Sequence, residues 1–326
     1  GTVGFQAPEV STLGPSVASD IFTIGRTLLV LSAEVPGYQS TYEFSIPPAD
    51  ELPAFAAQDS LYRLLLKCCA PNPSDRFASV EELRQQMLGV LREVVASQRP
   101  GVASASAISA LFEAPTIGHG TQYDALPRLR MDVTDPQADF LERLADQPAA
   151  VRLKALQNAS EQTKGVLLAQ GQAALDAGQP DVLSQYVSQL LDEDPWEWRA
   201  LWLAGLRALA VRDYPLAQSS FNAVYGQLPG ELAPKLALAL ACELGGEYDL
   251  AEVLYGICAS TDAAYVTPAA FGLSRIRSRR EDRAGSLAAR ALVPVTSRGY
   301  PESQRQRAAE LVASATDADG IAAAFA

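Results

Sequence analysis

The 326-residue sequence has a single histidine, His119, and four cysteines that form no Cys-x-x-Cys spacing. A metal site or a histidine-based catalytic centre needs several such side chains close together, and one imidazole in a glycine-flanked segment supplies neither. Two of the cysteines, Cys68 and Cys69, are adjacent on an apolar helical stripe. We therefore expect buried free thiols rather than a disulfide, and we assign no metal site to the chain.

The sequence also lacks an excess of positive charge and a long apolar run. Lysine and arginine together number 26, against 38 aspartate and glutamate residues, which gives a formal net charge of −12. Nucleic acid and an anionic membrane surface are therefore poor partners. No run of about 18 apolar residues occurs, and the first residues do not resemble a signal peptide. We expect a cytoplasmic protein with no membrane span and no nucleic-acid partner.

The first nine residues read GTVGFQAPE. Gly4 allows a tight turn, and Pro8 fixes φ for the start of a helix. Glu9 then places a carboxylate in the first turn of that helix, where negative charge is favoured. This segment resembles the end of the activation segment of a eukaryotic-type Ser/Thr protein kinase.

An almost wholly apolar stretch from Ile21 to Leu31 follows Ser19 and Asp20. A helix that is apolar on all sides belongs in the centre of a domain, and an aspartate at its start can accept hydrogen bonds from unpaired amides there. The stretch resembles the central helix of a kinase C-lobe, although Phe22 stands where many kinases have tryptophan. The proline-rich segment 35–53 is expected to be a surface loop.

Two further helices are predicted in the first hundred residues. A stripe with a 3.6-residue period from Leu61 to Cys69 predicts a helix that ends before Pro71. After a tight Asn-Pro-Ser-Asp-Arg turn, Ser79 and Glu82 form a capping box for a final helix that continues beyond residue 90.

The turn before that final helix has the form Pro-x-x-Arg, with Arg76 as its arginine. It resembles the turn near the end of kinase catalytic domains whose arginine pairs with the glutamate of Ala-Pro-Glu. We therefore predict an ion pair between Glu9 and Arg76 that is at least partly buried.

Several kinase motifs do not occur in the sequence: it contains no glycine-rich phosphate loop, no strand lysine, no His-Arg-Asp catalytic loop and no Asp-Phe-Gly. The tripeptide 211–213 reads Val-Arg-Asp, but Gln218 stands where a catalytic loop carries asparagine. We therefore assign no catalytic residue in this chain and expect the groups that hold ATP and Mg²⁺ upstream of Gly1. The chain alone is expected to be inactive.

The composition changes to small and helix-breaking residues from about residue 99 to residue 135. This predicts an interdomain linker with one short helix around Ala107 to Phe112. Short helices are expected at 137–146 and 149–158. The predicted domains are part of a kinase catalytic domain at 1–98, a linker at 99–136 and a helical repeat domain at 137–326.

The C-terminal half contains an internal repeat. Gly171, Gly205 and Ala239 recur at a spacing of 34 residues, and the aromatic pair Phe221 and Tyr255 has the same spacing. This period, with a small residue in the first helix and an aromatic in the second, is the tetratricopeptide pattern. Repeats are predicted near 164–197, 198–231 and 232–265, with a weaker unit from about 266 and a last helix at 301–313.

Taken together, these features resemble the mycobacterial and actinobacterial protein kinase G family. The phrases that carry the resemblance are GTVGFQAPEV, SVASDIFTIGRTL, NPSDRFASVEEL, PGELAPKLALALACEL, AAFGLSRIRS and VPVTSR. The resemblance implies a Ser/Thr kinase that transfers the γ-phosphate of ATP to protein substrates, with Mg²⁺ as cofactor and a rubredoxin-like metal module. It also implies repeats that recruit substrate or form a homodimer, and a forkhead-associated-domain metabolic regulator as a partner.

The resemblance also implies roles for individual residues. Thr2 would support the catalytic loop, and residues 3–6 would line the substrate position after the phosphoacceptor. The substrate-positioning set is Thr2, Val3, Gly4, Phe5 and Gln6, and the structural set is Glu9, Asp20 and Arg76.

We therefore predict an all-α chain in which part of a protein-kinase C-lobe, the end of its activation segment and its last helices, is followed by a tetratricopeptide-like α-solenoid. Two alternatives remain for its function. The chain could belong to a pseudokinase whose catalytic positions are degraded, or it could be a pure repeat scaffold that acts as a protein-binding module.

Overall fold

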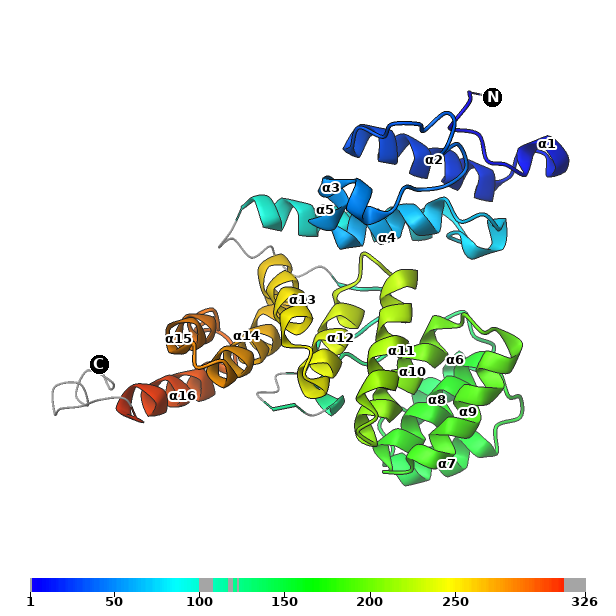
Figure 1. The fold of residues 1–326 in the computed structure, drawn as a ribbon. Coiled ribbons are helices and arrows are strands. Elements are labelled where there is room, and N and C mark those ends of the chain that lie inside the picture. The colour runs from blue at the N-terminus through cyan, green and yellow to red at the C-terminus, as the bar shows by residue number, and fades with distance from the viewer. Residues whose placement is uncertain (1, 100–107, 117–119, 122, 314–326) are drawn as a thin grey trace. The chain divides into compact units, whose positions relative to one another are not determined.

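The structure is a computed structural model that describes residues 2–99, 108–116, 120–121 and 123–313 (Figure 1). The chain divides into two compact units. Unit 1 consists of residues 1–99 and 225–231, and unit 2 of residues 100–224 and 232–326. Over the described residues every regular element is helical, apart from one isolated antiparallel bridge between Phe112 and Leu129. The prediction of an all-α fold is confirmed.

Unit 1 is built around one long helix, α2, which contacts both α4 and α5. Its core includes Phe22 of α2, Leu64 and Cys68 of α4, and Leu83 of α5. The elements of unit 1 are α1 (Val10–Leu13), α2 (Val17–Ser32), η1 (Ala49–Glu51), α3 (Pro53–Ala56), α4 (Asp59–Cys68), η2 (Pro73–Asp75) and α5 (Val80–Gln98).

The start of α2 differs from the prediction that Asp20 caps this helix. The helix begins at Val17, and the cap is Ser16, whose Oγ accepts from the Ser19 amide at 3.2 Å. The Ser16 amide in turn donates to Ser19 Oγ at 2.8 Å. Because these two serines satisfy the first amides, Asp20 is left in the first turn with its side chain exposed.

The other predicted features of unit 1 appear with small differences. At the start of α5, Ser79 accepts from the Glu82 amide, while the Glu82 carboxylate accepts from the Ala78 amide, one residue before the cap. The predicted surface loop at 35–53 contributes two buried side chains, Val35 and Leu52, to a second small core cluster.

Residues 225–231 belong to unit 1, which the predicted repeat boundaries do not anticipate. The Tyr225 hydroxyl lies 2.7 Å from Ser60 Oγ, and Lys67 Nζ donates to the Gln227 carbonyl at 3.0 Å. The Gly230 amide donates to Oε1 of Gln86 at 2.8 Å.

Unit 2 is a succession of helices in which neighbours in sequence pack together, for example α7 on α8, α8 on α9, and α13 on α14 (Figure 1). Its elements are η3 (Tyr123–Ala125), α6 (Ala138–Leu144), α7 (Ala149–Gln157), α8 (Lys164–Asp176), α9 (Pro180–Glu193), α10 (Trp198–Ala210), α11 (Tyr214–Gln227, whose last residues lie in unit 1), α12 (Leu232–Gly245), α13 (Tyr248–Thr261), α14 (Ala263–Arg279), α15 (Arg283–Ala291) and α16 (Tyr300–Ala313).

Glycine and aromatic residues set the spacing of the helices in unit 2. A Cβ atom added at Gly205 of α10 would lie 2.5 Å from the Phe221 ring, and one added at Gly272 of α14 would lie 2.4 Å from the Tyr255 ring. The two helices approach closely only because the glycine has no side chain, and the aromatic ring fills the space beside it. This is the packing that the 34-residue period predicts.

The predicted short helix at 107–112 is wrong for residues 108–112, which are not helical; residue 107 lies outside the described residues. Instead, the Arg130 amide donates to the Leu111 carbonyl at 2.9 Å, and the Glu113 amide donates to the Arg128 carbonyl at 2.8 Å. Phe112 is 1% exposed. Its ring packs against Trp202 of α10, with the ring centroids 4.9 Å apart. Burial of this aromatic therefore holds the segment extended against α10.

The cysteines and the apolar character of the helices bear on two further predictions. All four cysteines are free and buried, as predicted. No helix among the described residues has the length and apolar character needed to cross a membrane.

Candidate functional site

The opening segment, residues 2–9, lies against α2 and turns sharply at Gly4. The φ angle of Gly4 is +84°, a conformation that favours glycine. A Cβ atom at this position would also lie 2.7 Å from the Tyr38 carbonyl oxygen. Both the backbone conformation and the close approach of the 35–45 loop therefore require glycine here.

Arg26 of α2 holds the turn at Gly4 in place. Its guanidinium is completely buried. It donates to three backbone carbonyls: Nε to Gly4 at 2.7 Å, Nη2 to Tyr38 at 2.9 Å and Nη1 to Ser45 at 2.5 Å. Burial lowers the pKa of Arg26, and the three carbonyls compensate for the lost water. One side chain therefore joins the opening segment to the loop that follows α2.

Two further contacts hold the segment in place. Thr23 Oγ1 donates to the Phe5 carbonyl at 3.0 Å, and the Phe5 and Tyr38 rings meet edge to face with centroids 5.7 Å apart. Thr2 and Val3 remain exposed, Val3 to 54%. The backbone of the segment is thus fixed, while the side chains before the turn face solvent.

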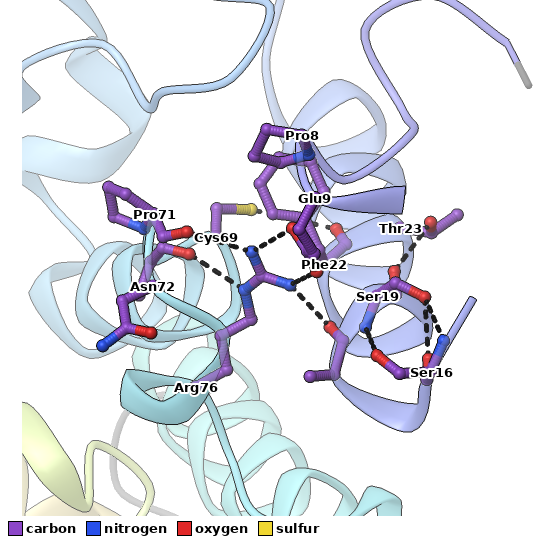
Figure 2. A network of polar contacts seen from close by, with 12 residues as sticks. Pro8, Glu9, Ser16, Ser19, Phe22, Thr23, Cys69, Pro71, Asn72 and Arg76 are labelled. Carbon is purple, nitrogen blue, oxygen red and sulfur yellow. Dashed lines mark hydrogen bonds and ion pairs between the residues drawn. The ribbon is translucent and has the colours of Figure 1, made fainter. Parts of the chain in front are cut away.

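Glu9 and Arg76 form the ion pair that the sequence predicts, although they are far apart in the chain (Figure 2). The pair is bidentate: Nη1 of Arg76 lies 2.6 Å from Oε1 of Glu9, and Nη2 lies 3.0 Å from Oε2. The arginine side chain is 0% exposed and the glutamate side chain 10%. This geometry is the strong, directional form of an arginine–carboxylate contact.

The remaining donors of Arg76 are also satisfied. Nε donates to the Ala70 carbonyl at 2.9 Å, and Nη1 donates to the Ala18 carbonyl in the first turn of α2 at 3.0 Å. The guanidinium also lies 4.9 Å from the centroid of the Phe22 ring. Arg76 therefore ties together the start of α1, the start of α2 and the turn before η2.

The ion pair shifts the titration of its carboxylate. The hydrogen bonds from Arg76 lower the pKa of Glu9 below its ordinary value of 4.5, and burial opposes this only in part. The carboxylate is therefore charged at neutral pH and is fully engaged by Arg76.

Asp20 is the third residue that the sequence assigns to the structural set. Its side chain is exposed in the first turn of α2. Its carboxylate has no hydrogen-bond partner among the described residues. It therefore takes no part in the Glu9–Arg76 network, and its role stays a prediction.

Sequence reasoning missed the part that Arg26 plays. In the sequence Arg26 is only one residue of the apolar stretch 21–31, whereas in the structure it anchors the opening segment and the loop that follows α2. An arginine within an almost wholly apolar helix was the available signal, because a guanidinium is rarely buried without several acceptors.

The contacts of this site hold the backbone of residues 2–9 in one conformation. The Glu9 carboxylate is paired, and Arg26 and Arg76 donate to backbone carbonyls or to that carboxylate. No group of three or more potential metal ligands occurs among the described residues. The arrangement fixes a backbone segment at the surface of unit 1.

An apolar groove lies elsewhere in unit 1, between α2, α4 and α5. Its volume is about 580 Å³. On the α5 side, Leu88 and Leu91 are 44% and 55% exposed. The side chains that line the groove are Ile24, Leu28, Ser32, Leu61, Leu64, Val80, Leu83, Arg84, Met87, Leu88, Val90, Leu91 and Val94.

Comparison with known proteins gives a consistent result over most of the chain. Residues 104–324 match the family described as "Protein kinase G tetratricopeptide repeat". The chain is 33% identical to the serine/threonine-protein kinase PknG of Mycobacterium leprae over 347 residues, which cover 96% of this chain and 45% of that protein. PknG of Mycolicibacterium smegmatis is also 33% identical, over 345 residues with the same two coverages.

A shorter match extends to a different kinase. The serine/threonine-protein kinase PknB of Mycobacterium tuberculosis is 30% identical over 147 residues, which cover 41% of this chain. The chain spans less than half the length of the two PknG relatives, 45% in each case.

Proposed function

Because the chain belongs to the protein kinase G tetratricopeptide repeat family, we propose that it is part of a serine/threonine protein kinase. The whole protein would transfer the γ-phosphate of ATP to Ser or Thr of protein substrates. Unit 1 would be the lower part of the kinase C-lobe, and residues 2–6 would line the substrate position that follows the phosphoacceptor.

The observation that carries this proposal is the way residues 2–9 are anchored. The bidentate Glu9–Arg76 pair holds the end of the segment, and the three carbonyl contacts of Arg26 hold its turn. Such buried guanidiniums keep a surface segment in one conformation, so a substrate would not have to order it on binding.

The residues of this chain do not fit a site for ATP and Mg²⁺. The sequence has no phosphate loop, no Asp-Phe-Gly and no catalytic loop, and the described residues hold no metal-ligand cluster. We therefore place these cofactors, and the catalytic groups, in a part of the whole protein outside these 326 residues. MgATP bound there would supply the phosphoryl group, residues 2–6 would position the acceptor polypeptide, and Glu9 would hold the end of their segment through its pair with Arg76.

We also propose partners, a location and a domain division for the whole protein. The repeats of unit 2 would recruit the protein substrate or mediate a homodimer, and a regulator with a forkhead-associated domain is the substrate class that the family suggests. We also propose a cytoplasmic location and keep the functional division at 1–98, 99–136 and 137–326. Asp20 would hold the backbone of the catalytic loop.

Phosphotransfer by two proteins side by side tests the proposal. The whole protein and the 326-residue chain are incubated with γ-labelled MgATP and a Ser/Thr peptide mixture. We expect transfer by the whole protein and none by the chain. Phosphate transfer by the 326-residue chain would place the chemistry within it. No transfer by the whole protein would favour a pseudokinase or a scaffold.

A further inference from the structure

Unit 2 contains a hollow beside the extended segment at 128–132. Its volume is about 470 Å³, within the range of about 300–1,000 Å³ that is typical of ligand pockets. The hollow lies between this segment and α6, α7 and α8. Its apolar wall consists of Leu129, Met131, Leu141, Leu144, Leu156 and Leu168.

Four basic side chains of the lining are paired within the chain. Arg128 and Arg152 share the carboxylate of Asp176, at 2.9 and 2.6 Å. Lys164 and Arg199 share the carboxylate of Glu197, at 2.5 and 3.3 Å. None of the four therefore offers an unpaired charge to a ligand.

The other charged side chains of the lining are engaged or lie at the rim. Asp135 accepts from the Thr163 hydroxyl and from the Gly165 amide. Asp132 accepts from Thr134, whose hydrogen bonds lower the pKa of this carboxyl. The exposed rim residues are Glu113, Arg130, Glu142 and Asp146. The centre of the hollow thus complements an uncharged, apolar side chain.

The outer side of the isolated bridge between Phe112 and Leu129 borders this apolar centre. Phe112 and Leu129 face each other as a pair whose own amides and carbonyls point away from the ladder. The Phe112 amide donates to Ser109 Oγ, and its carbonyl accepts from Arg130 Nε. Among the described residues, the amide and carbonyl of Leu129 have no hydrogen-bond partner.

We propose that the outer side of this bridge and this hollow bind an extended segment of a partner protein, which places one uncharged apolar side chain in the pocket. The partner backbone would pair with Leu129, and its next inward side chain would contact Leu144 and Leu168. This is strand addition, in which backbone hydrogen bonds supply affinity and a pocket supplies specificity. The proposal rests on the recruitment role assigned to unit 2.

The packing of Phe112 determines where a partner segment could bind. Phe112 already covers α10 through Trp198 and Trp202. A partner segment would therefore lie beside residues 128–132, over α6 and α8, and not on this part of α10.

Selection of random dodecapeptides displayed on phage against the 326-residue chain tests the proposal. We expect enriched peptides to share one aliphatic position flanked by uncharged residues. Ala169→Trp fills the pocket from α8, and Leu129→Pro removes the outward amide without touching the amides of Glu113 and Arg130 that hold the segment. Each variant should weaken binding by about tenfold or more. Val253→Asp, at a 60% exposed position of α13, should bind as wild type does.

Enriched peptides that bind both variants as tightly as wild type would overturn the proposal, and so would a selection that enriches no peptide. A phosphorylation assay with the whole protein distinguishes failure of the docking proposal from failure of the kinase assignment. With Leu129→Pro in the whole protein, kcat/KM should fall for a recruited protein substrate and stay unchanged for short Ser/Thr peptides. Loss of activity toward both substrates would count against a docking role.

Discussion

The two units of this chain are stabilised in different ways. In unit 1, the buried guanidiniums of Arg26 and Arg76 donate to carbonyls and a carboxylate in loops and turns that are distant in sequence. In unit 2, glycines such as Gly205 let neighbouring helices approach, and aromatic rings fill the remaining space. Loops held in one conformation need directional contacts, whereas stacked helices need matching volumes.

A buried ion pair also occurs in unit 2, but it joins helices. Glu243 of α12 pairs with Arg275 of α14 at 2.7 Å and accepts from the Tyr255 hydroxyl at 2.9 Å. The contrast is therefore in what the charges hold in place, and not in whether a unit contains buried charges.

The free cysteines allow the two units to be followed separately. Cys68 and Cys69 lie in unit 1, and Cys242 and Cys258 lie in unit 2. Burial raises the pKa of Cys69 to about 12 and that of Cys242 to about 11, so both thiols react slowly in the folded protein. Pulsed alkylation followed by mass spectrometry therefore reports the opening of each unit.

The largest effect is expected for Arg76→Ala. It leaves Glu9 without its partner and removes the donors that Ala18 and Ala70 accept from. Loss of one member of a buried pair costs about 3–5 kcal/mol of unfolding free energy. Urea titration with alkylation should show this loss at Cys68 and Cys69. Unchanged labelling there would break the contrast between the units.

Gly205→Ala should have the next largest effect, in unit 2. The added methyl group would lie 2.5 Å from the Phe221 ring, so the helices must move apart. Overpacking of this kind costs about 1–3 kcal/mol, measured by tryptophan fluorescence in urea. The matched control is Gly256→Ala in α13, where a Cβ atom meets nothing within 4 Å. That variant should gain stability, by up to about 1 kcal/mol.

The free energy of unfolding of unit 1 should depend on pH through the titration of Glu9. Its pKa in the folded state lies below the ordinary value of 4.5, so the stability it contributes is complete above pH 4.5. That contribution is lost as the pH falls through the folded pKa. The difference in unfolding free energy between wild type and Glu9→Gln should therefore shrink as the pH drops below 4.5. A difference that is constant with pH would show that the pair does not form in solution.

The smallest effect is expected for Arg84→Ala on α5. Arg84 pairs with Glu81 at 2.7 Å, but both side chains are more than half exposed, 59% and 58%. Solvent and salt screen an exposed pair one turn apart, so it contributes very little to the free energy of unfolding. The same urea titration should barely change. A loss that approaches the Arg76→Ala value would mean that burial does not decide the strength of these pairs.

Much of the fold could be predicted from the sequence because its signals are local or periodic. The 34-residue period places the repeat helices, and the Ala-Pro-Glu and Pro-x-x-Arg motifs single out Glu9 and Arg76. The acceptors of Arg26 could not be predicted, because they are backbone carbonyls of residues 4, 38 and 45 and carry no side-chain signal.

The segment at 108–132 shows a second limit of sequence reasoning. Its small and helix-breaking residues are typical of a linker, yet Phe112 is buried against α10 and Arg128 pairs with Asp176 of α8. Residues 225–231 show a third limit, because repeat periodicity does not reveal that Gly230 packs against Gln86 in unit 1. In each case a long-range contact decides the structure and leaves no mark on the local pattern.

The assignment of residues 2–6 to substrate positioning can be tested through the substrate preference of the whole protein carrying Val3→Asp. Val3 is 54% exposed, so its replacement should leave the anchored backbone in place. We test a peptide set that varies only at the residue after the phosphoacceptor. We expect the preference at that residue to shift toward lysine and arginine, and the KM for ATP to stay unchanged. An unaltered preference at that position, with activity retained, would contradict the assignment of residues 2–6 to substrate positioning.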